Sequence, residues 1–222
     1  MNKLKNKQMK EPINIDLNEI ITATPLRNNA FELSDAEKIN KIEYYFAEIM
    51  DTLGLDLTDD SLKDTPKRVA KMFVKEIFSG LNPKNKPAIS LFENKYGYNR
   101  MLVEKDITLY SNCEHHFVPI IGKAHVAYIP HNHVIGLSKI NRLVQYYAKR
   151  PQVQERLTVQ IAEALKEILE HEDVAVVIEA DHLCVASRGI HDTNSKTITD
   201  YFSGKFENDI IRQEFLSYIK NK

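Results

Sequence analysis

The side chains with the strongest metal-binding chemistry in this sequence lie in two short clusters. The first reads CEHH at 113–116, and the second reads HLC at 182–184. Each of the two cysteines of the chain lies in one of these clusters, next to or near histidine. Thiolate sulfur and imidazole nitrogen are ligands that zinc prefers. The clusters therefore predict one metal site assembled from two segments that are distant in the sequence.

The spacing suggests how the ligands divide. Cys113 and His116 can reach one ion from a single turn, and Cys184, 71 residues after Cys113, can supply a third ligand. Three protein ligands leave a fourth position for water, as in catalytic zinc sites, whereas structural sites usually have four protein ligands. His115 and His182 would then remain as an acid or a base beside the metal.

Two simpler interpretations stay open at this point. His115 or His182 completes a structural zinc site, or both cysteines are small buried side chains and the histidines lie at the surface. The residue types alone favour a metal site and leave its catalytic or structural nature unresolved. His125, His131, His133 and His171 are expected to be packed or solvated residues without a function.

Several cations lie where a polyphosphate could bind, although the sequence has no P-loop and no G-x-G-x-x-G motif. Ser138 and Lys139 open a predicted helix, whose free N–H groups favour anions, and Arg142 faces the same way as Lys139. Arg188 follows the second cluster, and Arg68 lies in another predicted helix. Taken singly, each of these residues is more simply a solvated surface charge.

Gln154 and Glu155 open the next predicted helix. The Glu155 carboxylate could favour the positive end of the helix, or it could accept two hydrogen bonds from a ligand with adjacent donors, such as the guanine edge. From the residues alone, the first interpretation is favoured.

The composition narrows the class of protein that carries these residues. A chain of 222 residues with a hydrophobic fraction of 43% suits one domain, with or without an N-terminal appendage. Its net charge of -1 argues against coating nucleic acid. Two cysteines cannot form a disulfide framework, which favours a reducing, cytoplasmic setting. The sequence contains no apolar run of the length expected for a signal peptide or a membrane span, and we expect residues 1–30 to form a flexible arm.

The periodicity predicts an α+β fold with an antiparallel sheet. A capping box of Ser34 and Glu37 predicts a helix that ends at Gly54, and Thr65 is the expected cap of a second helix that ends at Gly80. Strands are expected at 101–110 and 122–130, with Pro119 and Gly122 in the turn between them. Helices should follow from Ser138, as the cap, and from Pro151; the last elements expected are strands at 174–180 and 197–202 and a helix at 210–219.

Three blocks of this sequence strongly resemble the GTP cyclohydrolase I family: SNCEHHFVPIIGKAHVAYIP at 111–130, VIGLSKINRLVQYYAKRPQVQERLTVQIAEAL at 134–165 and HLCVASRGI at 182–190. The segment DTPKRVAKMFVKEIFSGL at 64–81 is similar to an N-terminal helix of that family. The resemblance runs from about residue 34 to residue 219. It implies an enzyme that converts GTP and water to 7,8-dihydroneopterin triphosphate and formate, the first step of folate and pterin synthesis.

The resemblance also assigns roles to the candidate residues. It implies that zinc binds to Cys113, His116 and Cys184 and activates water for attack at C8 of guanine. It implies that His182 is an acid or base at the ring nitrogen, that His115 lies by the ribose, and that Ser138 is the hydroxyl partner of His115. The implied triphosphate contacts are Lys139, Arg142, Arg188 and Arg68, and the implied purine contacts are Gln154 and Glu155.

The resemblance further implies the tunnelling fold: an antiparallel sheet with helices packed on one face, preceded by an N-terminal helical segment. Residues 31–222 would form the catalytic domain, with N-terminal helices at 34–80, and the chain would assemble as a homodecamer of two pentamers with active sites between subunits. GTP would be the partner, with no nucleic acid and no membrane. Asp200 and Tyr201 depart from the family pattern, as does His191, and put the contacts of the last strand in doubt.

Two other hypotheses remain. One is a nitrile reductase of the same fold, with a thiol nucleophile and a nicotinamide cofactor, which bound zinc would argue against. The other is a zinc-stapled binding protein without catalysis, which would bind zinc but not turn over GTP. If Cys113 and Cys184 share an ion, they should be able to form a disulfide once the ion is lost.

Overall fold

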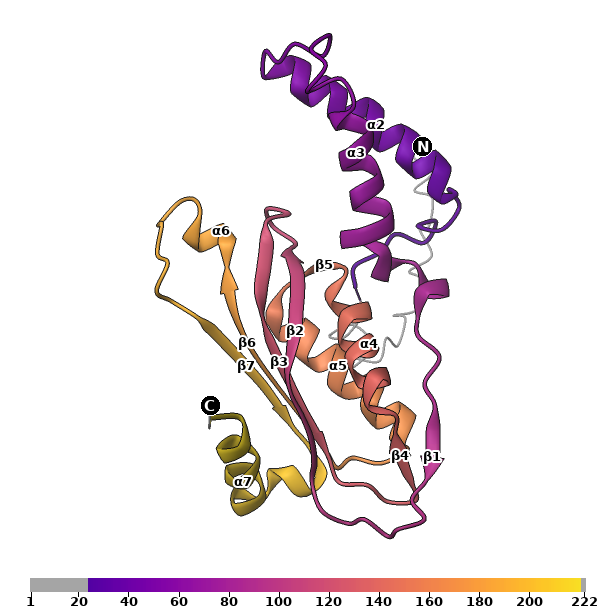
Figure 1. The fold of residues 1–222 in the computed structure, drawn as a ribbon, viewed down its shortest axis with the longest axis vertical. Helices are drawn as coiled ribbons and strands as arrows, with labels where there is room; N and C mark the ends of the chain where they lie inside the picture. Colours follow the sequence, from indigo (N-terminus) through magenta and orange to yellow (C-terminus); the bar gives the residue numbers. More distant parts are fainter. Residues whose placement is uncertain (1–23, 221–222) are drawn as a thin grey trace, which may run out of the picture.

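The computed structural model describes residues 24–220 of the chain. Of the expected arm at 1–30, residues 1–23 lie outside the described part. The described chain is elongated, with two helices projecting from one end of a body made of a sheet and helices (Figure 1). No described helix is both long and apolar enough to cross a membrane.

The projecting helices are α2 (Asp35–Thr52) and α3 (Thr65–Met72). The capping box predicted at the start of α2 is confirmed, because Ser34 Oγ accepts from Glu37 N at 3.3 Å and Glu37 Oε2 accepts from Ser34 N at 2.8 Å. The predicted cap of α3 is wrong by one residue: Asp64 is the N-cap, and Thr65 is already helical. The helix that was expected to reach Gly80 ends at Met72. It is followed by a short π-helical segment, η1 (Phe73–Ile77), and by two 3₁₀ segments, η2 (Ser79–Leu81) and η3 (Pro83–Asn85).

The body contains a five-stranded sheet in the order β5-β2-β3-β6-β7. The strands are β2 (Leu102–Cys113), β3 (Pro119–Tyr128), β5 (Pro151–Gln152), β6 (Val174–His182) and β7 (Thr197–Phe202). Neighbours are antiparallel except β2 and β5, which makes the sheet mixed. A separate pair, β1 (Leu91–Glu93) with β4 (His133–Ile135), was not predicted.

Pro119 and Gly122 lie inside β3, not in the expected turn before it. Gly122 is opposite Ala180 in β6, and a Cβ atom on Gly122 would lie 2.1 Å from the carbonyl oxygen of Glu179. This close approach of the two strands, rather than a turn, requires the glycine.

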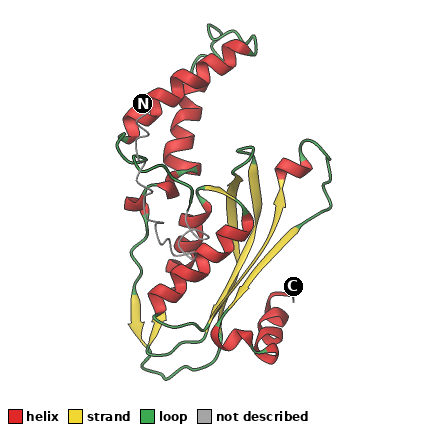
Figure 2. Cartoon of the chain, turned by 180° about the vertical axis from the view of Figure 1, so that it is seen from behind, coloured by secondary structure: helices red, strands yellow, loops and turns green. Residues whose placement is uncertain are grey.

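Helices α4 (Leu137–Ala148) and α5 (Gln154–Leu169) cover one face of the sheet, as expected (Figures 1 and 2). The expectation that helices pack on one face only is wrong, because η4 (Gly204–Glu207) and α7 (Asp209–Lys220) pack on the other face. Strand β6 shows the division: Val176 and Ile178 face α4 and α5, whereas Val177 packs near Phe206 and Phe215. Burial on both faces explains why this strand is apolar without alternation.

The predicted starts of α4 and α5 need correction. Gly136, not Ser138, is the N-cap of α4, and Ser138 lies within the helix. Pro151 does not open α5, because it belongs to β5; α5 begins at Gln154. Tyr201, one of the departures from the family pattern, donates from its hydroxyl to Glu163 Oε1 at 2.5 Å and so ties β7 to α5.

Candidate metal centre and active site

The two predicted clusters meet at one end of the sheet. The ligand atoms of Cys113, His116 and Cys184 all lie within 4.8 Å of one another. Cys113 Sγ and His116 Nδ1 are 3.9 Å apart, and a tetrahedral zinc with ordinary bond lengths would separate such atoms by about 3.6 Å. Among the described residues, neither His115 nor His182 belongs to this group. The three residues therefore fit a zinc ion.

Backbone geometry brings the ligands together. Cys113 is the last residue of β2, and its N–H and carbonyl bond to Val118 O and Phe117 N at 2.9 and 2.8 Å. These bonds, with the positive φ of 54° at Phe117, close a tight loop that presents His116 beside Cys113. Cys184 lies in the short helix α6 (Leu183–Ala186), directly after β6. Because Ile120 pairs with His182, the ends of β3 and β6 are adjacent.

The Cys184 thiol is protonated more readily than usual at this place. Burial raises the pKa of the Cys184 thiol, and the nearby Cys113 sulfur raises it further. Two thiols held this close favour their neutral forms until a cation compensates the negative charge of the thiolates. The donor set therefore suits a bound cation and is electrostatically unfavourable as a pair of bare thiolates.

His182 lies beside the metal group on β6. Burial lowers its pKa below the ordinary value, although Glu155 and Asp181 act in the opposite direction. Its Nε2–H donates to Gln154 Oε1 at 2.8 Å. Gln154 is 1% exposed, and its own Nε2 bonds to Ile178 O, Thr197 O and Thr199 Oγ1. The purine contact that the resemblance implies for Gln154 stays a prediction, because within this chain the amide is already hydrogen-bonded internally.

The remaining residues near the metal group are His115, Glu155 and Arg188. His115 is exposed, with Nδ1 3.7 Å from Cys113 Sγ. Arg188 Nη1 donates to His116 Nε2 at 3.0 Å, so this cation reaches the metal loop. Glu155 is exposed in the first turn of α5, where both interpretations of its carboxylate remain compatible with its position.

The other predicted residues lie elsewhere in the chain. The first half of α4 contains Ser138, Lys139 and Arg142. The N–H of Gly136, the N-cap of this helix, donates to Ser90 O, and the opposite end of α4 leads to β5. Arg68 is exposed on α3, 3.7 Å from Asp64. Within a single chain, the structure therefore does not bring these four residues to the metal group.

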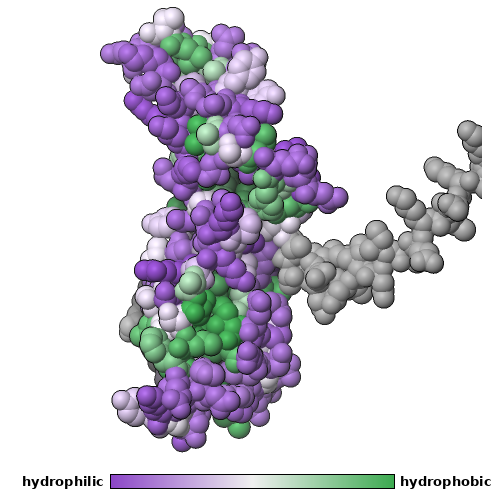
Figure 3. Space-filling model, turned by 90° about the vertical axis from the view of Figure 1, so that its right-hand side faces the viewer, coloured by the Kyte–Doolittle hydropathy of each residue, from purple (hydrophilic) through white to green (hydrophobic). Residues whose placement is uncertain are grey.

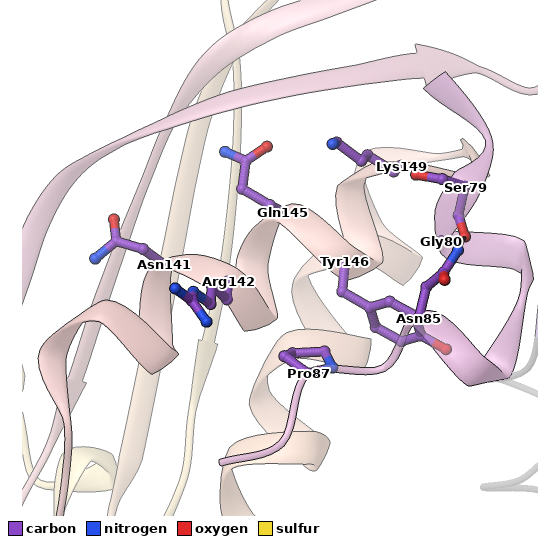
Figure 4. A pocket seen from close by; sticks show the side chains of 9 residues that line it. All are labelled: Ser79, Gly80, Asn85, Pro87, Asn141, Arg142, Gln145, Tyr146 and Lys149. Atoms are coloured by element: carbon purple, nitrogen blue, oxygen red, sulfur yellow. Dashed lines mark hydrogen bonds between the residues drawn. The ribbon is translucent and has the colours of Figure 1, made fainter. Parts of the chain in front are cut away.

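Arg142 lines a pocket of its own, with a volume of 380 Å³ (Figure 4). It is formed by α4 and the η2–η3 segment, and none of the three metal-group residues lines it. Figure 4 shows Arg142 on α4 and Lys149, the C-cap of that helix, among the side chains that line it. The lining residues are Ser79, Gly80, Asn85, Pro87, Asn141, Arg142, Gln145, Tyr146 and Lys149.

A second group of metal-binding types lies at the other end of β6. His131, His171 and Asp173 have ligand atoms within 4.8 Å of one another. However, the two imidazole rings are stacked, with centroids 4.1 Å apart and planes 18° apart, so their in-plane lone pairs cannot point at one ion. Asp173 Oδ2 already contacts His131 Nε2 at 2.8 Å and Lys205 Nζ at 3.2 Å. This group is a hydrogen-bonded anchor, in line with the packing role expected for these histidines.

Comparison with known proteins shows the family of this chain. The sequence model of the family described as GTP cyclohydrolase I matches residues 42–220. The chain belongs to the GTP cyclohydrolase I family. It is 63% identical over 196 residues to the GTP cyclohydrolase 1 of Flavobacterium johnsoniae, with 88% of each chain covered. It is 56% identical over 194 residues to that of Vibrio parahaemolyticus, covering 87% of this chain and 88% of the relative.

The match to the GTP cyclohydrolase I family confirms the resemblance deduced from the sequence blocks. Sequence reasoning missed Arg156, which pairs with Glu114 of the CEHH cluster. The only available signal was its position in the RPQVQERLT segment, which the resemblance used without assigning Arg156 a role. The stacking of His131 on His171 was also missed, since nothing in their separation along the chain predicts it.

Proposed function

We propose that this protein is a zinc-dependent GTP cyclohydrolase I that converts GTP and water to 7,8-dihydroneopterin triphosphate and formate. The observation that carries the proposal is the convergence of Cys113, His116 and Cys184 with His182 beside them, in a chain of this family. As the first step of pterin and folate synthesis, the reaction opens the imidazole ring of guanine.

Zinc would be held by Cys113, His116 and Cys184, and when bound it supplies the Lewis acidity that activates water for attack at C8. The protein's own groups move the protons. His182 is neutral at pH 7, because burial lowers its pKa, and Gln154 fixes the orientation of its ring. We assign to it proton transfer at the ring nitrogen of guanine, a role that histidine fills more often than any other side chain.

His115 and Ser138 would serve the later rearrangement of the ribose. Glu155 would accept from the ring N–H and amino group of guanine, which present adjacent donors. The triphosphate would be held by the cations Lys139, Arg142, Arg188 and Arg68.

We further propose the tunnelling fold, with residues 31–222 as one catalytic domain, and a homodecamer of two pentamers with active sites between subunits. A site shared between subunits is supported by the distance, within one chain, between the metal group and four predicted site residues: Ser138, Lys139, Arg142 and Arg68. Apolar side chains exposed on α2 and at its C-cap, namely Tyr44, Tyr45, Ile49 and Leu53, offer surface for such contacts. Figure 3 shows apolar patches on the projecting helices and on the body. A cytoplasmic location is part of the proposal, because thiolate ligands need a reducing setting.

The test is an assay of the purified, zinc-loaded oligomer with GTP, which follows a fluorescent oxidised pterin and formate together. Cys184→Ala should remove both zinc and turnover. If a zinc-loaded oligomer forms neither product, the proposal fails, and a zinc-stapled binding protein becomes the better explanation. Metal analysis of the same sample separates the cyclohydrolase from a nitrile reductase.

A further inference from the structure

A polar network lies behind the metal loop (residues 113–118) and is centred on Arg156 of α5. Arg156 has a side chain that is only 13% exposed, and its Nη2 pairs with the carboxylate of Glu114 inside the loop. The same guanidinium donates from Nε to Gln152 Oε1 at 3.2 Å and from Nη2 to Pro151 O at 3.5 Å. One side chain therefore contacts the loop and the neighbouring strand β5.

Gln152 extends this network into the core. It is fully buried, and its Nε2 donates to Tyr147 O and to Gln160 Oε1, both at 2.9 Å. Its carbonyl accepts from Glu114 N at 2.9 Å, and the residue pairs with Cys113 between β5 and β2. Glu114 is thus held at its backbone by Gln152 and at its side chain by Arg156.

The energetics argue for a role in positioning. A desolvated ion pair contributes little net stability, because the cost of removing both charges from water offsets their attraction. Groups that orient metal ligands from behind, in contrast, commonly change metal affinity by about 10- to 100-fold when they are removed. Glu114 lies between Cys113 and the two histidines of the loop, and its Oε1 is 3.9 Å from His115 Nε2. Without Arg156, this carboxylate would be free to turn toward His115 and change the shape of the loop.

We propose that Arg156 is a positioning residue for the metal loop: by holding Glu114, it fixes how Cys113 and His116 present their ligand atoms and so sets the metal affinity of the site. The inference rests on the proposed zinc site. It concerns a residue whose described hydrogen bonds and ion pair go to Glu114, Gln152 and Pro151 and not to the three proposed ligands. It predicts a property that is measured without substrate.

The experiment compares Arg156→Met, Arg156→Lys and Glu114→Gln with the wild-type protein. Zinc affinity is measured by competition with a chromophoric chelator, and the ligand geometry is followed by the absorption of the cobalt-substituted protein. Arg156→Met should weaken zinc binding by about 10- to 100-fold and alter the cobalt spectrum. Arg156→Lys keeps the charge but not the fork of donors, so its loss should be smaller. Glu114→Gln keeps one hydrogen bond and should also bind zinc more weakly.

Lys166→Met is the matched control. Lys166 is also on α5, has a side chain only 16% exposed, and pairs with Glu163 and Glu172 away from the metal loop. This variant should lose stability and keep the zinc affinity of the wild-type protein. A folded Arg156→Met protein with unchanged zinc affinity and cobalt spectrum would overturn the proposal; if that variant does not fold, unchanged values in Arg156→Lys and Glu114→Gln would do so. A wild-type protein that binds zinc but does not turn over GTP would instead overturn the proposed function alone.

Discussion

His182 and Gln154 share one hydrogen bond, in which the Nε2–H of the imidazole donates to the buried amide oxygen over 2.8 Å. The amide cannot rotate freely, because its nitrogen bonds to the carbonyls of Ile178 and Thr197. The bond therefore fixes both the orientation and the tautomer of His182, and it leaves Nδ1 as the nitrogen that is free to accept a proton.

Replacing Gln154 by Leu should lower kcat by roughly 10- to 100-fold with a smaller change in KM for GTP, because the proton-transferring ring loses its orientation. Steady-state kinetics with GTP measures both constants. Thr199→Val is the control, since Thr199 Oγ1 bonds to Gln154 Nε2 but not to His182 in the described contacts. A higher KM with unchanged kcat would instead assign Gln154 to the purine contact that the family resemblance implies.

Local signals in the sequence predicted the elements that depend on neighbouring residues. The capping box of Ser34 and Glu37 and the apolar stripe that follows it placed α2 within two residues at each end. The metal group was also predictable, because thiols and imidazoles form few other sites together. In each case the information lies in residue types and short spacings.

Contacts between distant segments were not predictable in this way. The two-residue strand β5 exists only because Gln152 pairs with Cys113, 39 residues earlier, and this pairing delays the start of α5 from Pro151 to Gln154. Gln154 was expected at a helix start, but nothing in the sequence indicated that it would be 1% exposed beneath β6 and β7. Such burial depends on how the sheet and helix pack, which no local pattern records.

Loss of zinc should leave Cys113 and Cys184 able to form a disulfide, because their sulfur atoms lie within 4.8 Å of each other. After chelation and mild oxidation, titration under denaturing conditions should find no thiol where the chain has two cysteines. The zinc-loaded protein, treated with the same oxidant, should keep both thiols, because the metal holds them as ligands. An unchanged thiol count after metal removal would contradict a common ligation of the two residues.

Gly80→Ala should destabilise the fold by more than about 2 kcal/mol. A Cβ atom at this position would lie 2.0 Å from Tyr146 O and 2.8 Å from Lys149 O, so the end of α4 and the η2 segment would have to separate. Urea denaturation measures the free energy of unfolding. Gly136→Ala is the control, since its Cβ would meet no atom closer than 3.4 Å, and a change within about 1 kcal/mol is expected. Equal losses in both variants would show that the close approach at Gly80 is not the cause.

His171, which stacks on His131, should make stability depend on pH. Burial lowers the pKa of His171 below its ordinary value of 6.5, and the neighbouring His131 lowers it further. Because Asp173 N donates to Nδ1 of His171, protonation there would also remove an acceptor. As pH falls, His171 therefore takes up its proton in the unfolded chain before it does so in the folded protein. The free energy of unfolding should be constant well above pH 6.5. It should decrease below pH 6.5 until the lower pKa of the folded state is reached.

Urea denaturation between pH 8 and pH 5 tests this dependence. His171→Phe keeps a ring to stack on His131 and removes the titrating group. The free energy of unfolding of this variant should therefore fall less steeply with acid than that of the wild-type protein. The two slopes should differ by at most about 1.4 kcal/mol per pH unit. His133→Phe, at an exposed position, should leave the wild-type slope unchanged. If the His171→Phe protein shows the same slope as the wild-type protein, His171 does not titrate as described.

The division of the candidate site within one chain leads to a test of the shared active site. Arg68 lies on α3, whereas Cys184 lies on α6 after the far end of β6. If a site between subunits takes Arg68 from one chain and zinc ligands from another, Arg68→Ala and Cys184→Ala should each be nearly inactive alone. Co-assembled at equal amounts, they should regain activity in about a quarter of the sites, because random assortment joins the two intact halves that often.

His116→Ala with Cys184→Ala is the control: both ligands belong to one metal group in one chain, so this mixture should stay inactive. The first mixture could instead be no more active than the mean of its two components. Arg68 and the metal group of the same chain would then act together, and the proposed sharing between subunits would be wrong.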